Sequence, residues 1–372
     1  MTALAVPNLF QWSDTAKTRM NRPLPSQALD IRFVDPTCDP EWDSVVASHP
    51  NSSFFHCAAW TRVLCKTYGH KPISLRFSRN GEPVSLVPLL EVESPFTGRR
   101  AVSLPFTDYC GPLFFGECHP DIVSDKLCEL ACERHWRYFE LRGGKTSRES
   151  AGSSVAFYGH SLELRGGPER LFAGLTESVQ RAIRKAERSN LRVKVSQSRD
   201  SILEFYRLHV RTRRRHGLPP QPRSFFLNIH SEIIKPGLGF VVLARKGSTP
   251  VAAAVFFHIG KKALYKFGAS DERHQDLRGN NLVMWKAIEL LAQNGFQTLH
   301  LGRTSLENEG LRRFKRAWGT VEETIEYFRF DRTANDWIRA RDNVSGFHNA
   351  VFARLPLGFN RLLGAMIYPH LD

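Results

Sequence analysis

The sequence lacks the features that mark several large classes of protein. It has no uninterrupted apolar stretch of the ~18 residues that a membrane-spanning helix needs, and its best apolar run, Val251 to Phe257, has the length of a strand. The N-terminus has no basic region followed by a sustained apolar core, so a secretory signal is not expected. The motifs GxSxG and HExxH are missing, which argues against a hydrolase or a zinc protease. We therefore expect a soluble protein.

Cysteine is present without a pairing pattern. The seven cysteines are an odd number, all lie between Cys38 and Cys132, and they include no CxxC pair. Because disulfide frameworks and zinc sites use even counts or such pairs, neither is indicated. We expect reduced thiols in a cytoplasm, no bound metal and no tightly bound cofactor.

Negative charge is scarce and unevenly placed. The chain of 372 residues has 52 Lys and Arg against 37 Asp and Glu, a formal net charge of +15. Residues 165 to 223 alone hold 15 cationic and 5 acidic side chains, a surplus of 10. Such a concentration indicates a partner that bears phosphate, such as nucleic acid, a nucleotide-linked sugar, coenzyme A or a lipid diphosphate.

One segment in this basic region is predicted to form a two-faced helix. Between Thr176, a plausible N-cap, and Ser189, apolar residues recur at the spacing of one helical face. Four cations have the same spacing, each two residues after an apolar one: Arg181, Arg184, Lys185 and Arg188. A solvated outer face is one interpretation and an anionic partner is the other. A second basic group, which includes Arg303, lies further along the chain.

Turn signals divide the chain into two similar halves. Residues 1–29 show no period and are interpreted as a loose leader. Asn80-Gly81 between two β-rich runs predicts a hairpin, and a similar hairpin is predicted around Gly247, 166 residues later. A Gly- and Ser-rich stretch, residues 143–154, separates the halves. We therefore predict a duplicated mixed α/β unit with domains at 30–154 and 155–330.

The pattern of segments in the second half predicts a parallel crossover connection. Strands are expected at 239–244, 252–259 and 264–268, followed by a loop, a helix at 281–294 that ends at Gly295, and a strand at 298–301. A short helix at 309–317 and a strand at 324–330 follow. Ligands in such sheets tend to sit where strand ends open onto loops. Residues 331–372 are predicted to form basic amphipathic helices that either dock on the second domain or lie on an anionic membrane surface.

Several motifs together resemble a known family. Residues 171–193 and 299–319 resemble the segments that open and close the second domain of the FemA/FemB/FemX family, and residues 52–60 resemble its opening segment. The layout, with residues 105–113 and 354–364, is most similar to the FemAB-like proteins that accompany exopolysaccharide and exosortase systems. The resemblance spans about residues 50 to 330. It implies a mixed α+β fold of two tandem GNAT-like (acyl-CoA N-acyltransferase) domains, each with a mixed, mostly antiparallel twisted sheet, the first degenerate and the second catalytic.

The resemblance also implies an activity and some site residues. Family members transfer an aminoacyl group from a charged tRNA to the amine of a peptidoglycan precursor. Their Phe-Lys pair matches Phe314-Lys315, and the lysine steadies charge on the departing nucleotide end. Their basic helix, which binds phosphates of the acceptor, matches the 180–188 region. The long insertion that forms the helical arm of larger members is missing here, which weakens the case for recognition of a whole tRNA.

A coenzyme A donor is the second possibility. The segment that binds acetyl-CoA in GNAT domains reads Arg or Gln, two residues, Gly, one residue, then Gly or Ala. Residues 276–281 match only at the middle glycine, Gly279. Backbone amides at this helix start, with Arg278 and Asn280 beside them, could still hold a phosphate.

Acyl transfer to an amine needs alignment, a stabilised oxyanion and a leaving group, and none of these requires a metal. We predict that Lys315 supplies electrostatic stabilisation, unless it is one more solvated lysine on a basic helix. Asp108, in a loop with Tyr109, is predicted to accept a proton from the amine or to hold it by charge. Arg303 and Tyr109 complete the predicted set around the substrate.

The sequence thus predicts an acyltransferase that acts on a phosphorylated or lipid-linked acceptor. Its localisation is expected to be cytoplasmic, with peripheral contact to the inner face of the membrane as an option. An acyl-CoA-dependent N-acetyltransferase is the alternative enzyme. A non-catalytic protein that binds nucleic acid or anionic lipid is the alternative from another class. The oligomeric state and the identity of donor and acceptor stay open.

Overall fold

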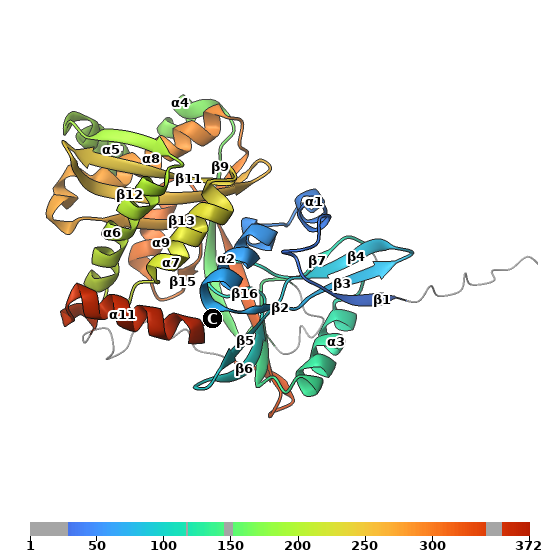
Figure 1. Ribbon diagram of the computed structural model, residues 1–372. Coiled ribbons are helices and arrows are strands. Elements are labelled where there is room, and N and C mark those ends of the chain that lie inside the picture. The colour runs from blue at the N-terminus through green and yellow to red at the C-terminus, as the bar shows by residue number, and fades with distance from the viewer. Residues whose placement is uncertain (1–28, 117, 145–151, 340–351) are drawn as a thin grey trace, which may run out of the picture.

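The computed structural model describes residues 29–116, 118–144, 152–339 and 352–372. Within these residues the strands form one sheet of thirteen strands and one of four (Figure 1). The predicted loose leader, residues 1–29, lies outside the described residues except for residue 29.

The four-stranded sheet belongs to the first half of the chain. Its order is β1-β3-β4-β7, formed by Asp30–Val34, Ser74–Arg79, Glu82–Val87 and Leu113–Phe114. β3 and β4 pair antiparallel across Asn80-Gly81, whose φ angles of 55° and 83° are both positive. A two-residue hairpin turn of this type needs that conformation at both positions, so the predicted hairpin is confirmed. Helices α1 (Trp42–Ser48), α2 (Ala58–Tyr68) and α3 (Pro120–Glu133) belong to the same half.

The thirteen-stranded sheet runs through both halves. Its main path is β10 (Arg192–Ser196), β11 (Gly239–Lys246), β12 (Thr249–Ile259), β13 (Lys262–Ser270), β14 (Thr298–His300), β9 (Val155–Glu163), β16 (Val321–Asp331), β8 (Tyr138–Arg142), β6 (Gly98–Val102), β5 (Leu90–Ser94) and β2 (Lys71–Pro72). β15 (Thr304–Ser305) pairs with β9, and β17 (Asp336–Ile338) with β16. Because β16 pairs with β9 on one side and β8 on the other, backbone hydrogen bonds continue across the boundary predicted at residue 154.

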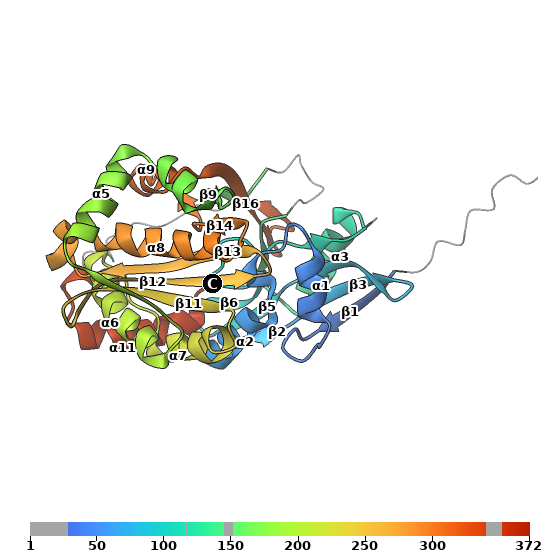
Figure 2. The same ribbon diagram turned by 90° about the horizontal axis from the view of Figure 1, so that it is seen from above.

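The predicted crossover in the second half is confirmed. β11, β12 and β13 form an antiparallel meander, and α8 (Gly279–Gln293) carries the chain to β14, which pairs parallel with β13. α8 ends before Gly295, whose φ of 72° fits the predicted left-handed cap. α5 (Glu177–Arg188) and α8 cover one face of this part of the sheet, and α6 (Arg199–Arg215) and α7 (Arg223–Ile229) cover the other (Figure 2).

The remaining helical elements are short. They are α4 (Gly167–Ala173), α9 (Glu309–Arg316) and α11 (Leu357–Ile367), with short turns η1 (Phe54–His56), η3 (His230–Ile234), η4 (Glu272–Leu277) and η5 (Tyr368–His370). Of the region predicted to be helical, residues 331–372, residues 340–351 lie outside the described residues and residues 336–338 form strand β17 instead. Among the described residues, no helix combines the length and the apolar character needed to cross a bilayer.

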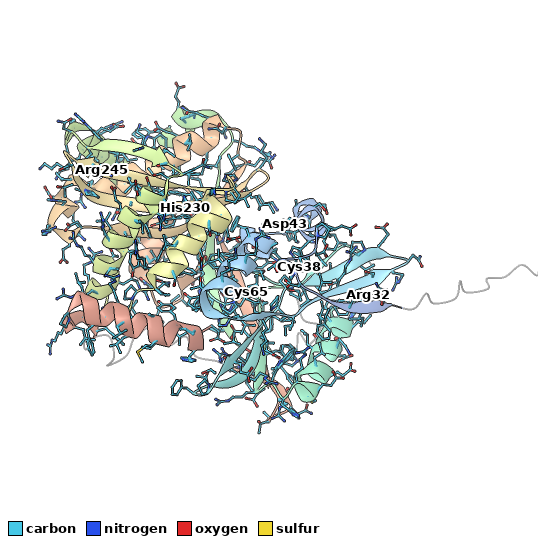
Figure 3. The ribbon with its side chains drawn as sticks, in the orientation of Figure 1. Arg32, Cys38, Asp43, Cys65, His230 and Arg245 are labelled. Carbon is cyan, nitrogen blue, oxygen red and sulfur yellow. The ribbon has the colours of Figure 1, made fainter. Side chains whose placement is uncertain are left out.

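None of the seven cysteines, all of which lie within the described residues, forms a disulfide bond. Cys38 is exposed at the surface of the first half, and Cys65 lies apart from it on α2 (Figure 3).

Candidate active site

A cleft of about 380 Å³ lies where the two halves meet. The first half contributes residues 50–55, Asp108 and Tyr109, and the second half contributes residues 262–264, 323–325, Ser161, Thr298 and His300. The second-half residues sit at the start of β13, around β14 and on β9 and β16. The cleft therefore contains the amino end of β13 and the short strand β14, which follows the crossover helix.

Asp108 lies among several positive charges at this cleft. Its side chain is only 16% exposed, and Lys266 Nζ lies 3.4 Å from its Oδ2. A Cβ added at Gly302 would lie 3.4 Å from the same oxygen, so the backbone after β14 closes against the carboxylate. Burial by itself would raise the pKa of Asp108, but the positive charges of Lys266 and Arg303 outweigh it and lower the pKa. Asp108 is therefore an ionised carboxylate, suited to hold a cation and weak as a proton acceptor.

Buried hydrogen bonds fix the loop that carries Asp108. The Tyr327 hydroxyl donates to the Asp108 carbonyl at 2.9 Å and accepts from Arg303 Nη1 at 2.7 Å. The Arg303 guanidinium also lies over the Phe157 ring, 4.2 Å from its centroid. Tyr327 thus ties a loop of the first half to a basic residue of the second half.

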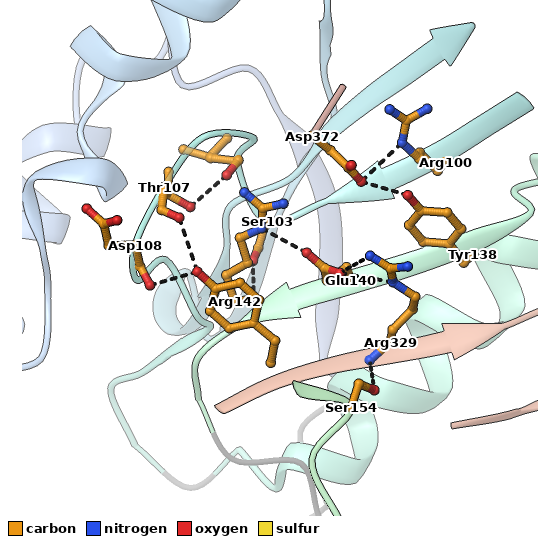
Figure 4. A network of polar contacts seen from close by, with 12 residues as sticks. Arg100, Ser103, Thr107, Asp108, Tyr138, Glu140, Arg142, Ser154, Arg329 and Asp372 are labelled. Carbon is orange, nitrogen blue, oxygen red and sulfur yellow. Dashed lines mark hydrogen bonds and ion pairs between the residues drawn. The ribbon is translucent and has the colours of Figure 1, made fainter. Parts of the chain in front are cut away.

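A second polar network lies behind this loop (Figure 4). Glu140, on β8, is 3% exposed and accepts hydrogen bonds from Arg142 Nε and Arg329 Nε, both at 2.9 Å. The Arg142 carbonyl accepts from the Cys110 backbone N–H at 2.7 Å, two residues after Asp108. Asp372 accepts from Arg100 and from the Tyr138 hydroxyl at 3.1 and 2.7 Å. The Glu140–Arg329 contact joins the two halves, and the Asp372 contacts join the C-terminal segment to the first half.

The interpretation of Lys315 as a solvated lysine is wrong. Lys315 is only 4% exposed. Its Nζ donates to the Gly302 carbonyl at 2.8 Å and to the Arg303 carbonyl at 2.9 Å. Burial lowers the pKa of Lys315 to about 8. The negative charge of Asp108 acts in the opposite direction but does not offset the burial. Lys315 therefore fixes the loop that faces Asp108. Its neighbour Phe314 is 36% exposed and packs its ring edgewise against Trp318.

A histidine and a glutamate form a further pair in the cleft. His300 Nδ1 accepts the Gly302 backbone N–H at 3.0 Å, and His300 Nε2 lies 3.5 Å from Glu323 Oε1. The hydrogen bond from His300 lowers the pKa of Glu323, which is 58% exposed at its side chain. This pair links the cleft to solvent.

The cations of α5 lie on the exposed surface, outside the lining of this cleft. The buried residues of α5 are Val179, Ile183 and Ala186, as the apolar stripe predicted. Arg184 lies over the Phe172 ring at 5.4 Å. Arg181 forms an ion pair with Glu177 at 3.3 Å. Lys185 and Arg188 are also exposed. α5 begins beside α9, since the Thr176 N–H donates to the Ala317 carbonyl.

Arg278, Gly279 and Asn280 lie away from the cleft, at the start of α8. β13 is nine residues long, so its end near α8 lies roughly 26 Å from its start in the cleft lining. A Cβ on Gly279 would lie 3.1 Å from Ala252 Cβ. The close packing of α8 on β12 therefore explains why a glycine occupies position 279. Arg278 is exposed, with a φ of 55°.

Three residues near Asp108 were not predicted from the sequence: Lys266, His300 and Tyr327. His300 ends the crossover strand β14, a position that the crossover rule could have marked. Lys266 and Tyr327 lie within strands β13 and β16, where no local pattern distinguishes them from their neighbours.

His56, which follows the cleft residues 50–55 in the chain, is fully buried, and its burial predicts a pH dependence of stability. Its Nε2 donates to the Gly111 carbonyl at 2.9 Å, and its Nδ1 accepts the Ser53 backbone N–H at 3.0 Å. Burial lowers its pKa from 6.5 to about 4. Because the unfolded chain binds more protons between these values, the stabilisation is present above pH 6.5 and lost as pH falls towards 4.

We expect the free energy of unfolding, measured with urea across this pH window, to fall less steeply in His56→Gln than in the wild type. His119→Gln is the matched control, since the His119 side chain is 68% exposed. It should keep the wild-type slope. An unchanged slope in His56→Gln would contradict the assignment.

Comparisons with known proteins support the fold. Residues 175–316 match the family model described as "Acetyltransferase (GNAT) domain". The structure is similar to a crystal structure of FemX, with a TM-score of 0.65, 14% identity, and 81% of this chain and 97% of that chain covered. No curated protein sequence matches the chain.

Two further solved structures have the same arrangement. One is a tandem GNAT protein from the clavulanic acid biosynthesis pathway, with a TM-score of 0.53, 10% identity, and 82% and 99% of the two chains covered. The other is L-PGS from Bacillus licheniformis, with a TM-score of 0.50, 11% identity, and 89% and 97% covered. The mixed α+β fold of tandem GNAT-like units is thus confirmed, and the resemblance to the FemA/FemB/FemX family holds at the level of the fold. The second half carries an acyltransferase domain of the GNAT type.

Proposed function

We propose that this protein transfers an acyl or aminoacyl group to the amine of a phosphorylated cell-envelope precursor, related to peptidoglycan or an exopolysaccharide. The observation that carries the proposal is Asp108, an ionised carboxylate in a cleft between the two halves. In this proposal residues 155–330 form the catalytic domain and residues 30–154 a degenerate one that completes the cleft. The GNAT domain match supports the reaction type.

Asp108 would hold the acceptor amine, which enters as an ammonium ion. A carboxylate whose pKa lies below its usual range binds such a cation well and is a poor general base. The ammonium would give its proton to water in the cleft, which is open to solvent beside the exposed Glu323 carboxylate. The neutral nitrogen then attacks the donor carbonyl carbon, and the leaving oxygen or sulfur departs with a proton.

Lys315 and Arg303 would supply positive charge beside the reacting carbonyl. Lys315 is a positioning residue in this scheme, because its Nζ donates to the carbonyls of Gly302 and Arg303 and so fixes the loop opposite Asp108. Preorganised charge in a buried site stabilises a developing oxyanion without reorganisation.

The donor is the open choice within this proposal. The resemblance to the FemA/FemB/FemX family suggests an aminoacyl-tRNA as the donor. An acyl-CoA donor is the second candidate, and the family model over residues 175–316 favours it. Two parallel assays separate them: release of coenzyme A from acetyl-CoA, and transfer of a labelled amino acid from aminoacyl-tRNA, each with amino-sugar and nucleotide-linked muropeptide acceptors. Product from neither donor, with intact binding of nucleic acid, would favour a non-catalytic binder.

Lys315→Met should slow transfer by about tenfold to a hundredfold, because the loop opposite Asp108 loses its buried anchor and a positive charge. In the wild type the lysine contribution should fade as pH rises through about 8, where its ammonium loses the proton. The ratio of wild-type to Lys315→Met rates should therefore shrink above that pH. Lys246→Met, at an exposed position, is the control. A ratio that is constant with pH would contradict the assigned role.

A further inference from the structure

α11 presents an apolar face to solvent. Phe359, Leu362 and Met366 follow one another at spacings of three and four residues, and they are 56%, 56% and 60% exposed. Residues at these spacings share one side of a helix. α11 lies at the outside of the second half, beneath α6 in Figure 1. A large apolar patch on a surface helix marks an interaction site.

The opposite side of α11 is packed tightly against the protein. Asn360 and Gly364 are its buried residues. A Cβ on Gly364 would lie only 2.1 Å from the Pro220 carbonyl oxygen, so the helix approaches this backbone as closely as a glycine permits. The rotation of α11 about its axis is therefore fixed, and the outward direction of Phe359, Leu362 and Met366 is built into the fold.

Further apolar side chains lie near the end of this helix. Leu371 is 40% exposed, and Phe96, from the turn between β5 and β6, is 80% exposed. The Phe96 ring meets the His370 ring edge-on, with 5.0 Å between the centroids. The apolar surface thus extends from α11 past η5 to the first half of the chain.

Arginines line one side of α11, where the helix meets α6. A cleft of about 390 Å³ between α6 and α11 has an apolar lining of Leu203, Tyr206, Val210 and Leu357, and a cationic one of Arg207, Arg211, Arg223 and Arg361. A neighbouring cleft of about 430 Å³ adds Arg214, Arg215 and Arg273. Asp271 forms ion pairs with Arg211 and Arg273. Within the described part of the chain, Arg207, Arg214, Arg223 and Arg361 form no ion pair with a carboxylate.

We propose that α11 and the arginines beside it form a docking face for an anionic lipid bilayer. Phe359, Leu362 and Met366 enter the boundary between headgroups and acyl chains, and the arginines contact lipid phosphates. A helix with an apolar face and cations beside it has the physical character of an interfacial helix. Because these guanidinium groups have no carboxylate partner among the described residues, the charge favours an anionic surface as the occupant. This inference does not depend on the proposed transfer reaction.

Flotation of the full chain with lipid vesicles tests the proposal. The vesicles consist of phosphatidylcholine alone or of phosphatidylcholine and phosphatidylglycerol in equal parts. We expect binding to the anionic vesicles, weakened by added salt, and a loss of partitioning by at least about tenfold in the triple variant Phe359→Ser, Leu362→Ser, Met366→Ser. A control triple variant, Phe33→Ser, Ile122→Ser, Val195→Ser, removes exposed apolar residues elsewhere and should bind as the wild type does.

A second pair of variants tests the arginines. Arg207→Gln, Arg223→Gln, Arg361→Gln should lose binding and its salt dependence, whereas Arg192→Gln, Lys194→Gln, Lys246→Gln, which removes the same charge from the β10–β11 edge, should retain both. Equal binding of all variants would overturn the proposal. A dimer in light scattering that the α11 triple variant dissociates would also overturn it, because a second copy of the chain would then cover this face.

Discussion

Glu140→Gln should lower the free energy of unfolding by about 3–5 kcal/mol, since removal of one member of a buried ion pair leaves the partner charges uncompensated. Glu140 is 3% exposed and accepts hydrogen bonds from Arg142 and Arg329. Arg142 is itself only 4% exposed. Glutamine keeps the size of the side chain, so the loss would come from charge and hydrogen bonding, with little effect of a cavity. Urea denaturation of the full chain measures it.

Glu93→Gln is the matched control for this experiment. Glu93 also forms an ion pair with an arginine, Arg99, at 2.9 Å, but their side chains are 53% and 39% exposed. An exposed pair of this kind contributes little, so Glu93→Gln should leave the free energy of unfolding nearly unchanged. Equal losses in the two variants would show that burial does not strengthen the Glu140 network, and would contradict its role in joining β8 to β16.

Asp108→Asn should reduce transfer by about a hundredfold to a thousandfold, because the amine loses the charge that holds it opposite the donor carbonyl. The steady-state rate with the active donor and acceptor measures the effect. Asn keeps the shape of the side chain, and the Asp108 backbone carbonyl still accepts from Tyr327. The loop should therefore keep its position. Asp200→Asn, at an exposed position on α6, should leave the rate unchanged.

Asp108→Asn also leaves a buried cation without its carboxylate. Lys266 is 7% exposed at its side chain and lies over the Phe55 ring, 4.6 Å from the centroid. The single variant should therefore lose stability. The double variant Asp108→Asn, Lys266→Met should recover part of that stability, because no unpaired charge stays buried. If transfer returned together with stability, Asp108 would have a structural role alone.

Local sequence patterns predicted much of the second half. The meander, the buried helix and the parallel strand after it depend on short-range periodicity and on Gly295, and the structure contains all of them. The apolar stripe of α5 is buried as predicted. Helical periodicity is sufficient for such elements because their burial follows from spacing within a single segment.

Long-range pairing could not be predicted in the same way. Arg329 and Glu140 are 189 residues apart, and their contact depends on β16 pairing with β8 across the predicted domain boundary. Lys315 lies on a helix with three arginines, and only the tertiary contact with Gly302 and Arg303 distinguishes the buried cation from the others. The same limit explains why Lys266 was missed.

The central claim is that an amine is acylated in the cleft beside Asp108. Mass spectrometry of the acceptor, after incubation of the protein with acetyl-CoA or aminoacyl-tRNA and with glucosamine or a nucleotide-linked muropeptide, tests this most directly. The account predicts an acceptor heavier by one acyl or aminoacyl group with the wild type, and at least about a hundredfold less of it with Asp108→Asn. Equal amounts of acylated product from both proteins would contradict the account.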